Sequence, residues 1–191
     1  MPEMNLQLIV FLVCVGILTV ISAVVDLKIK KIPNKLTLPM FVAGLVYQTV
    51  FNGLGTGVGQ AGLIDSAAAF AAGFGLLWVL WMIGGGGGGD VKLMGALSVW
   101  IGFKLTCFVL VLSTVFVILG TLGVMFGSVL TKGLFKTKET YLATGKQSKG
   151  EPPAAESAVQ RQARRVMGYA PPVALATWLL VLLKLRNFPN F

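Results

Sequence analysis

Histidine is absent from the 191 residues, and the only two cysteines, Cys14 and Cys107, each lie within an apolar run. No Cys-x-x-Cys pair occurs, so a zinc site built from cysteine and histidine is excluded and a disulfide is not indicated. Charged residues are also scarce, at 12% of the chain against 55% hydrophobic residues, and the mean hydropathy is +0.83. That balance excludes an ordinary soluble domain. We expect no metal ion and no other cofactor.

The few charges are mostly basic, with 16 lysines and arginines against seven acidic residues and a net charge of +9. These basic residues fall between apolar runs and form no face interleaved with aromatic residues. We therefore expect no nucleic-acid partner and interpret the positive charges as signals of membrane topology.

The apolar runs leave room for about six helices that span a lipid bilayer, since each needs about 20 residues. The chain is thus predicted to be an all-α integral membrane protein, a polytopic bundle in which residues 1–191 form a single membrane-embedded domain. The expected helices are Leu6–Val25, Leu36–Phe51, Leu63–Ile83, Val91–Phe103, Leu105–Leu130 and Tyr169–Leu185.

Four lysines follow the first run and none precede it, which places the N-terminus outside and the loops at about 26–35 and 131–168 in the cytoplasm. The stretch Val91–Phe103 is only about 13 residues long, so it is either a thin span or a re-entrant segment. We choose the span, because it keeps the eight basic residues of 131–168 in the cytoplasm. Within that loop, residues 137–165 are predicted to be mobile.

Three acidic residues, Asp26, Asp65 and Asp90, lie in or beside apolar spans, where carboxylates are costly enough to be functional candidates. The topology places Asp26 and Asp90 at the same face, whereas Asp65 lies near the other end of its helix. We interpret Asp65 as a cap of that helix, with Ser66 beside it. Only Asp26 and Asp90 can meet.

Two carboxylates at close range cannot both ionise, so one holds a proton while the other acts as a base. Aspartic hydrolysis requires this division: the base activates a water molecule and the acid protonates the developing oxyanion. Because the two protons titrate as a coupled pair, the roles of acid and base are not assigned individually.

Six consecutive glycines, Gly84 to Gly89, precede Asp90. Each glycine within a helix costs about 1 kcal/mol relative to alanine, so this run is predicted to be a loop or hinge. Next to an aspartate, such a backbone can approach an extended substrate closely; the structural alternative is a plain flexible turn. Lys92 either extends to the membrane interface or favours the ionised pair, two interpretations that we weigh equally.

Two motifs now carry a resemblance to a known family, the type IV prepilin peptidases. The first aspartate motif of that family resembles the segment from Asp26 to Ile32-Pro33-Asn34. The second, a GxGD motif, resembles Gly87-Gly88-Gly89-Asp90-Val91-Lys92-Leu93. More weakly, Gly168-Tyr169-Ala170-Pro171-Pro172 is similar to the tyrosine-proline start of the family's last helix.

The resemblance implies a GxGD-type aspartic endopeptidase with Asp26 and Asp90 as its catalytic residues. It would remove the basic leader of type IV or Flp-type prepilins or pseudopilins, usually after a glycine, at the cytoplasmic face of the bacterial inner membrane. Further residues are implied near the substrate or as a hinge: Gly87, Gly88, Gly89, Lys92, Ile32, Pro33 and Asn34.

The longer members of the family carry an N-methyltransferase region with paired cysteines. Here Asp26 directly follows the first helix and no such cysteines exist. The chain is therefore more similar to the short peptidases of tight-adherence pilus systems. Whether it forms a homo-oligomer is left open by the sequence.

The alternative function is a small ion-coupled transporter or channel that uses membrane aspartates. The sequence shows neither repeated halves nor acids at the middle of spans. A noncatalytic subunit of a secretion system is a third hypothesis. It differs from the peptidase in tolerating substitution of both aspartates.

Overall fold

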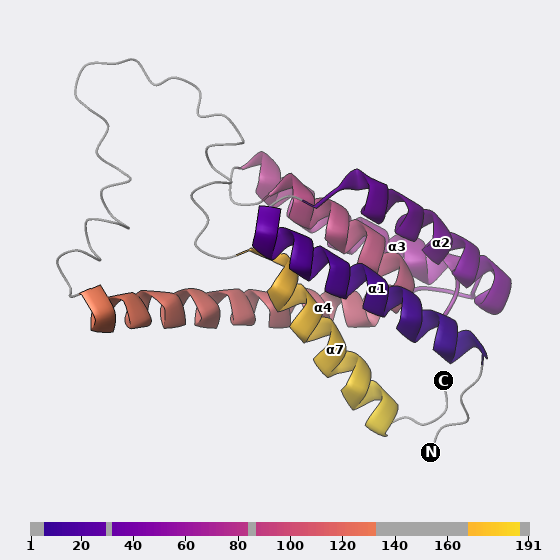
Figure 1. Ribbon diagram of the computed structural model, residues 1–191. Coiled ribbons are helices and arrows are strands. Elements are labelled where there is room, and N and C mark those ends of the chain that lie inside the picture. The colour runs from indigo at the N-terminus through magenta and orange to yellow at the C-terminus, as the bar shows by residue number, and fades with distance from the viewer. Residues whose placement is uncertain (1–5, 30–31, 84–86, 133–167, 188–191) are drawn as a thin grey trace, which may run out of the picture. The chain divides into compact units, whose positions relative to one another are not determined.

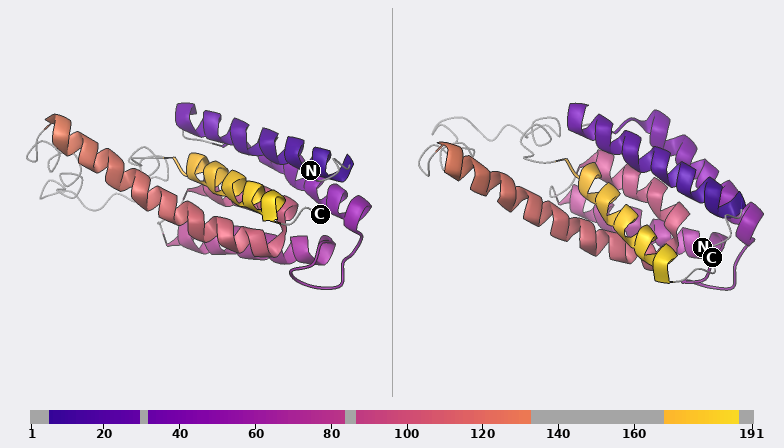
Figure 2. Two further views of the ribbon diagram at one scale, coloured as in Figure 1. Left: turned by 90° about the horizontal axis from the view of Figure 1, so that it is seen from below. Right: turned by 60° about the horizontal axis from the view of Figure 1, so that its bottom comes forward.

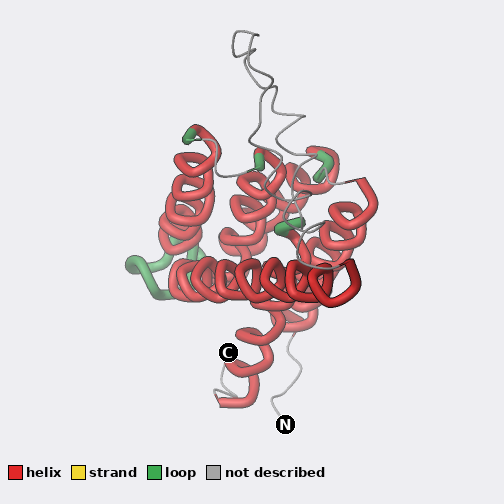
Figure 3. The backbone as a smooth tube through the Cα atoms, turned by 90° about the vertical axis from the view of Figure 1, so that its left-hand side faces the viewer, coloured by secondary structure: helices red, strands yellow, loops and turns green. Residues whose placement is uncertain are grey.

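The computed structural model describes residues 6–29, 32–83, 87–132 and 168–187 (Figure 1). Every regular element in this part of the chain is a helix, and the short connections are loops and turns (Figure 3). The helices are α1 (Leu6–Ile29), α2 (Asn34–Asn52), α3 (Leu63–Met82), α4 (Gly88–Lys132) and α7 (Ala170–Asn187). The predicted all-α fold is confirmed.

Among the described residues, three helices are long and apolar enough to cross a membrane: α1, α3 and the part of α4 from Gly88 to Val124. The prediction of an integral membrane protein is therefore supported by length and composition. The expected second and last helices form as α2 and α7. In α2, Pro39 lies inside the helix, and α7 carries its two prolines in its first turn, where their missing N–H groups cost no hydrogen bond.

The chain divides into two compact units, residues 1–114 with 168–191, and residues 115–167. In the second unit, residues 115–132 continue α4 as a helix. Most of the predicted cytoplasmic loop 131–168, including its mobile segment 137–165, lies outside the described residues. Gly84 to Gly86 and the lysines at 30 and 31 lie outside them as well.

In the first unit, α1 packs against α7 and α2, and α2 packs against α3 (Figure 2). The first part of α4, residues 88–101, forms much of the core, where Leu93, Met94 and Leu97 are at most 1% exposed. Along α1, one face is buried and the opposite face exposes apolar side chains such as Val13 and Val20. Exposed apolar faces of this kind suit contact with lipid.

The helical path of α4 breaks at Gly102, whose φ of 78° and ψ of 173° are not helical. Glycine suits this position because a side chain at positive φ would be strained. The break leaves the N–H of Phe103 without a partner inside the helix, and the Oδ2 of Asp65, from α3, accepts it at 3.1 Å. A side chain from another helix thus caps the second part of α4.

The carbonyl groups that precede the break are also satisfied by side chains of neighbouring helices. The buried amide of Gln48, from α2, donates to the carbonyl of Val99 at 3.2 Å and to that of Trp100 at 3.3 Å. The hydroxyl of Ser66, from α3, donates to Val99 at 3.0 Å. Buried polar side chains therefore stabilise the turn within α4.

The contacts of α4 show that its two parts run in opposite directions within the first unit. The charge of Asp90, before the break, raises the pKa of the Tyr169 phenol. Ser113, well after the break, forms a hydrogen bond of 2.9 Å with the same hydroxyl. Gly102 between them lies against Asp65 instead. The break at Gly102 lies one residue before the expected end of Val91–Phe103, close to the predicted boundary with Leu105–Leu130.

Candidate functional site

Asp26 lies in the last turns of α1, with only 5% of its surface exposed. Its Oδ2 accepts a hydrogen bond of 3.0 Å from the backbone N–H of Ala170, the first residue of α7. The first N–H groups of a helix have no partner inside that helix, so this donor is available to the carboxylate. No donor to Oδ1 occurs in the described part of the chain.

The carboxylate of Asp26 lies in the space that a side chain at residue 168 would fill, and Gly168 has no side chain. A Cβ added to Gly168 would collide with the Oδ2 of Asp26, an atom that belongs to another helix. A larger residue at this position would therefore displace either the carboxylate or the start of α7.

Asp90 lies in the first turn of α4 and is 7% exposed. Its Oδ2 accepts the N–H of Gly87 at 3.2 Å, and its own N–H donates to the carbonyl of Gly87 at 3.0 Å. The positive end of the α4 dipole favours a negative charge at this position. Each aspartate therefore receives a backbone N–H near the start of a helix: Asp90 from Gly87, the residue before α4, and Asp26 from Ala170, the first residue of α7.

The structure corrects the predicted loop at the glycine run, because Gly88 and Gly89 already belong to α4. These glycines lie in the first turn, whereas the sequence argument considered the cost of glycine in a helix interior. Gly88 lies beside the ring of Trp81, 3.7 Å from the position that its Cβ would take.

Tyr169 connects the surroundings of the two aspartates. Burial raises the pKa of its phenol, the hydrogen bond to Ser113 lowers it, and the nearby Asp90 carboxylate raises it. The next residue, Ala170, binds Asp26 near the end of α1, and Gly89, beside Asp90, approaches Ile32 just after α1, so both aspartates lie at the same end of the first unit. In Figure 1 the start of α7 lies beside the C-terminal end of α1.

The two sequence motifs are in contact. Pro33 is extended, with φ of −73° and ψ of 138°, and α2 begins at Asn34. The side chain of Lys92, from α4, donates to the Oδ1 of Asn34 at 2.8 Å. A Cβ added to Gly89 would lie 3.4 Å from the backbone nitrogen of Ile32, so the two backbones approach closely. The predicted residues Ile32 to Asn34 therefore pack beside the start of α4.

Asp65 does not cap α3 as predicted. The cap of that helix is Gly62, with no side-chain hydrogen bond, and Asp65 instead accepts the N–H groups of Gly59 at 2.5 Å and Phe103 at 3.1 Å. Sequence periodicity could not reveal this role, since both donors come from other segments. Ser113 was likewise missed, because a serine within an apolar helix has no motif around it.

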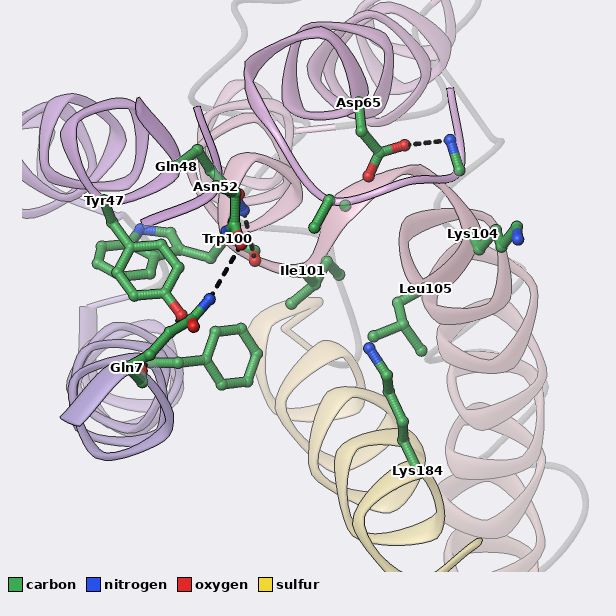
Figure 4. Close-up of a pocket in the computed structure, with 14 residues that line it drawn as sticks. Gln7, Tyr47, Gln48, Asn52, Asp65, Trp100, Ile101, Lys104, Leu105 and Lys184 are labelled. Atoms are coloured by element: carbon green, nitrogen blue, oxygen red, sulfur yellow. Dashed lines mark hydrogen bonds between the residues drawn. The ribbon is translucent and has the colours of Figure 1, made fainter. Parts of the chain in front are cut away.

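A cavity of about 250 Å³ lies at the Asp65 end of the first unit. Its lining includes Gln7, Tyr47, Asn52 and Lys184, and Figure 4 shows Lys184 extending into it from α7. Neither Asp26 nor Asp90 lines this cavity. Among the described residues, no group of three or more cysteine, aspartate or glutamate side chains is placed to hold a metal ion.

Comparison with known proteins agrees with the motifs. The model of the type IV leader peptidase family matches residues 10–123. The prepilin leader peptidase/N-methyltransferase of Escherichia coli strain K12 is 30% identical over 99 residues, which cover 48% of this chain and 41% of that protein. The chain thus matches less than half the length of this relative. No solved structure matches the chain.

Proposed function

Because the chain belongs to the type IV leader peptidase family, we propose that it is an aspartic endopeptidase that cleaves prepilins with Asp26 and Asp90 as its catalytic pair. The observation that carries this proposal is the position of the two buried carboxylates at one end of the first unit. Asp26 lies in the last turns of α1 and contacts the start of α7, and Asp90 follows Gly89, whose backbone approaches Ile32 just after α1. Asp65, the other aspartate within a helix of the described part, is occupied by two backbone N–H groups at the other end of the unit.

The proposed reaction is the hydrolysis of a peptide bond by a water molecule. The ionised aspartate takes a proton from the water as its oxygen attacks the scissile carbonyl, and the protonated aspartate donates to the carbonyl oxygen. Collapse of the tetrahedral intermediate breaks the C–N bond: the leaving nitrogen takes the proton that the base had accepted, and a hydroxyl of the intermediate returns a proton to the other aspartate as the carboxyl product forms. Asp26 has Oδ1 for the water, since Oδ2 is held by Ala170.

The proposed substrate is a type IV or Flp-type prepilin, or a pseudopilin, whose basic leader is removed at the cytoplasmic face of the bacterial inner membrane. The motif resemblance and the family support this substrate class. The lysines after α1 support a cytoplasmic face, since basic residues are enriched on that side of membrane proteins. Gly87, Gly88, Gly89, Lys92 and Ile32 to Asn34 are proposed to lie near the substrate.

Co-expression with a candidate prepilin in membranes tests the proposal. Leader removal would be followed by gel shift and mass for wild type, Asp26→Asn and Asp90→Asn. Each variant should lose cleavage by several orders of magnitude while still inserting, because neither can share a proton between two carboxylates. Asp65→Asn is the matched control, a buried aspartate outside the pair, and should cleave in proportion to the amount inserted.

Equal processing by wild type and both pair variants would refute the peptidase. The transporter hypothesis, in which the aspartates move protons or bind cations, would then be tested by ion uptake in vesicles. Loss of cleavage by Asp26→Asn and Asp90→Asn alone would support the pair, and the product mass would locate the scissile bond.

A further inference from the structure

The segment Gly168-Tyr169-Ala170, here called the α7 start segment, contacts the candidate site from outside the matched family region. The match to the family model covers residues 10–123 and does not reach this segment. Within the described chain, the backbone of Ala170 is the donor to the carboxylate of Asp26, and the charge of Asp90 raises the pKa of the Tyr169 phenol.

Asp26 needs this contact because of its place in its own helix. It lies near the C-terminal end of α1, where the helix dipole is negative and disfavours an anion. The N-terminus of α7 has the opposite sign and supplies an N–H that its own helix does not use. A hydrogen bond from a backbone N–H to an ionised carboxylate is stronger than one to a neutral group.

Two further contacts hold the α7 start segment in place. The hydroxyl of Tyr169 forms a hydrogen bond of 2.9 Å with Ser113, on the second part of α4. The carbonyl of Tyr169 accepts the N–H of Val173 at 3.2 Å, which ties the segment to the first turn of α7. The lack of a side chain at Gly168 then allows the carboxylate of Asp26 to come close.

We propose that the α7 start segment is a positioning element for Asp26, in which the Ala170 N–H orients the carboxylate and favours the ionised form of the aspartate pair. The proposal rests on the proposed peptidase function. The segment contacts the Asp26 carboxylate, and its proposed effect on the reaction passes through that group. It fixes Oδ2 and so determines which way Oδ1 faces.

Ala170→Pro tests the proposal directly, because it removes the N–H while placing proline at the first position of a helix, where proline is well accepted. The acidic limb reports protonation of the coupled pair, whose ionised form has one hydrogen-bond donor fewer in this variant. The acidic limb of the pH–activity profile of prepilin cleavage should therefore shift to higher pH. Maximal kcat should fall about tenfold with little change in KM, since a charge-assisted hydrogen bond is lost at the reacting carboxylate.

Two variants separate this effect from a general change in packing. Ala170→Gly keeps the N–H, and its acidic limb should coincide with that of wild type. Tyr169→Phe keeps the ring but removes the hydroxyl that anchors the segment to Ser113. It should shift the limb in the same direction as Ala170→Pro, by less. This variant decides the question if Ala170→Pro fails to insert in the membrane.

Carbodiimide labelling of Asp26, followed by peptide mass, gives a readout that does not need cleavage. Carbodiimides react with protonated carboxyl groups, so labelling of Ala170→Pro should persist to higher pH than labelling of wild type. A shift in labelling without any cleavage by wild type would support the positioning element and refute the proposed function. An unchanged labelling profile and an unchanged acidic limb in Ala170→Pro, or equal shifts in Ala170→Gly, would overturn the positioning element.

Discussion

Lys92 Nζ donates a hydrogen bond of 2.8 Å to the Oδ1 of Asn34, and so joins two motifs that are 58 residues apart in sequence. The same two elements also meet where Gly89 approaches Ile32. These contacts hold the start of α2 against the start of α4. Lys92, which makes one of them, is two residues after Asp90 in the sequence. Of the two interpretations of Lys92, extension to the interface and support of the ionised pair, neither includes this contact.

We expect Lys92→Met and Asn34→Ala each to lower prepilin cleavage, because each removes the hydrogen bond between the two motifs. The loss should be only about two- to fivefold, because an exposed hydrogen bond contributes little free energy. The double variant should lose no more than the worse single variant, since both remove the same contact. Lys35→Met, an exposed lysine at the start of α2, is the control and should cleave like wild type. Additive losses, measured by initial cleavage rates, would show that the two residues act separately.

The helices and the position of the aspartates could be predicted from the sequence because both depend on local patterns. A run such as Leu6–Val25 is apolar enough to indicate a helix in a lipid bilayer, and α1 covers this run with a few additional residues. The first helix ends near Asp26 and another begins near Asp90, so topology alone placed the two carboxylates at one end. That inference needed no knowledge of packing.

The sequence could not predict which face of each helix is buried, or which side chains bind the backbone groups at the break in α4. Along α1 nearly every residue is apolar, so periodicity does not distinguish Val15, which is buried, from Val13, which is exposed. Gly102 is one of many glycines in the chain, so the sequence does not mark it as the site of the break. The side chains that bind the backbone beside it, Gln48 and Asp65, come from other helices. Contacts of this kind exist only after the helices have assembled.

Gly102→Ala should lower the free energy of unfolding in detergent by about 1–3 kcal/mol, because alanine is strained at a φ of 78°. Its Cβ would also collide with the Oδ2 of Asp65, the acceptor for Phe103. Gly75→Ala is the matched control, since a Cβ at that helical glycine meets no atom within 4 Å. Equal thermal stability of the two variants would contradict a structural role for the break.

Gln48→Leu should destabilise the protein by about 1–3 kcal/mol while nearly keeping the side-chain volume, because it removes the Gln48 donor from the Trp100 carbonyl and leaves the Val99 carbonyl with Ser66 as its side-chain donor. The same change at Asn52 is no control, since Asn52 donates to Gln48 itself. Thr49→Val is suitable, because its exposed hydroxyl bonds only to its own helix at the carbonyl of Leu45. Equal unfolding midpoints of the two variants in detergent would contradict the proposal that Gln48 stabilises the break by donating to these carbonyl groups.

Two hydroxyl groups on α1 are predicted to respond oppositely to removal. The hydroxyl of Thr19 accepts the ring N–H of Trp178 at 3.1 Å, whereas the buried hydroxyl of Ser22 has no hydrogen-bond partner among the described residues. Thr19→Val leaves the N–H of Trp178 without an acceptor and should cost about 1–2 kcal/mol of unfolding free energy. Ser22→Ala removes a desolvated group without a partner, and should be neutral or stabilise by up to about 1 kcal/mol.

The comparison of these two variants is well matched, since both residues lie on the buried face of α1 within one turn of each other and each change removes one hydroxyl. Thermal unfolding in one detergent, followed by the fluorescence of the tryptophans, would give both values. A loss of stability in Ser22→Ala as large as that in Thr19→Val would mean that Ser22 binds a group outside the described residues. Because Ser22 precedes Asp26 by one helical turn, prepilin cleavage by Ser22→Ala should then be measured, and a fall in kcat would place that group beside the proposed catalytic pair.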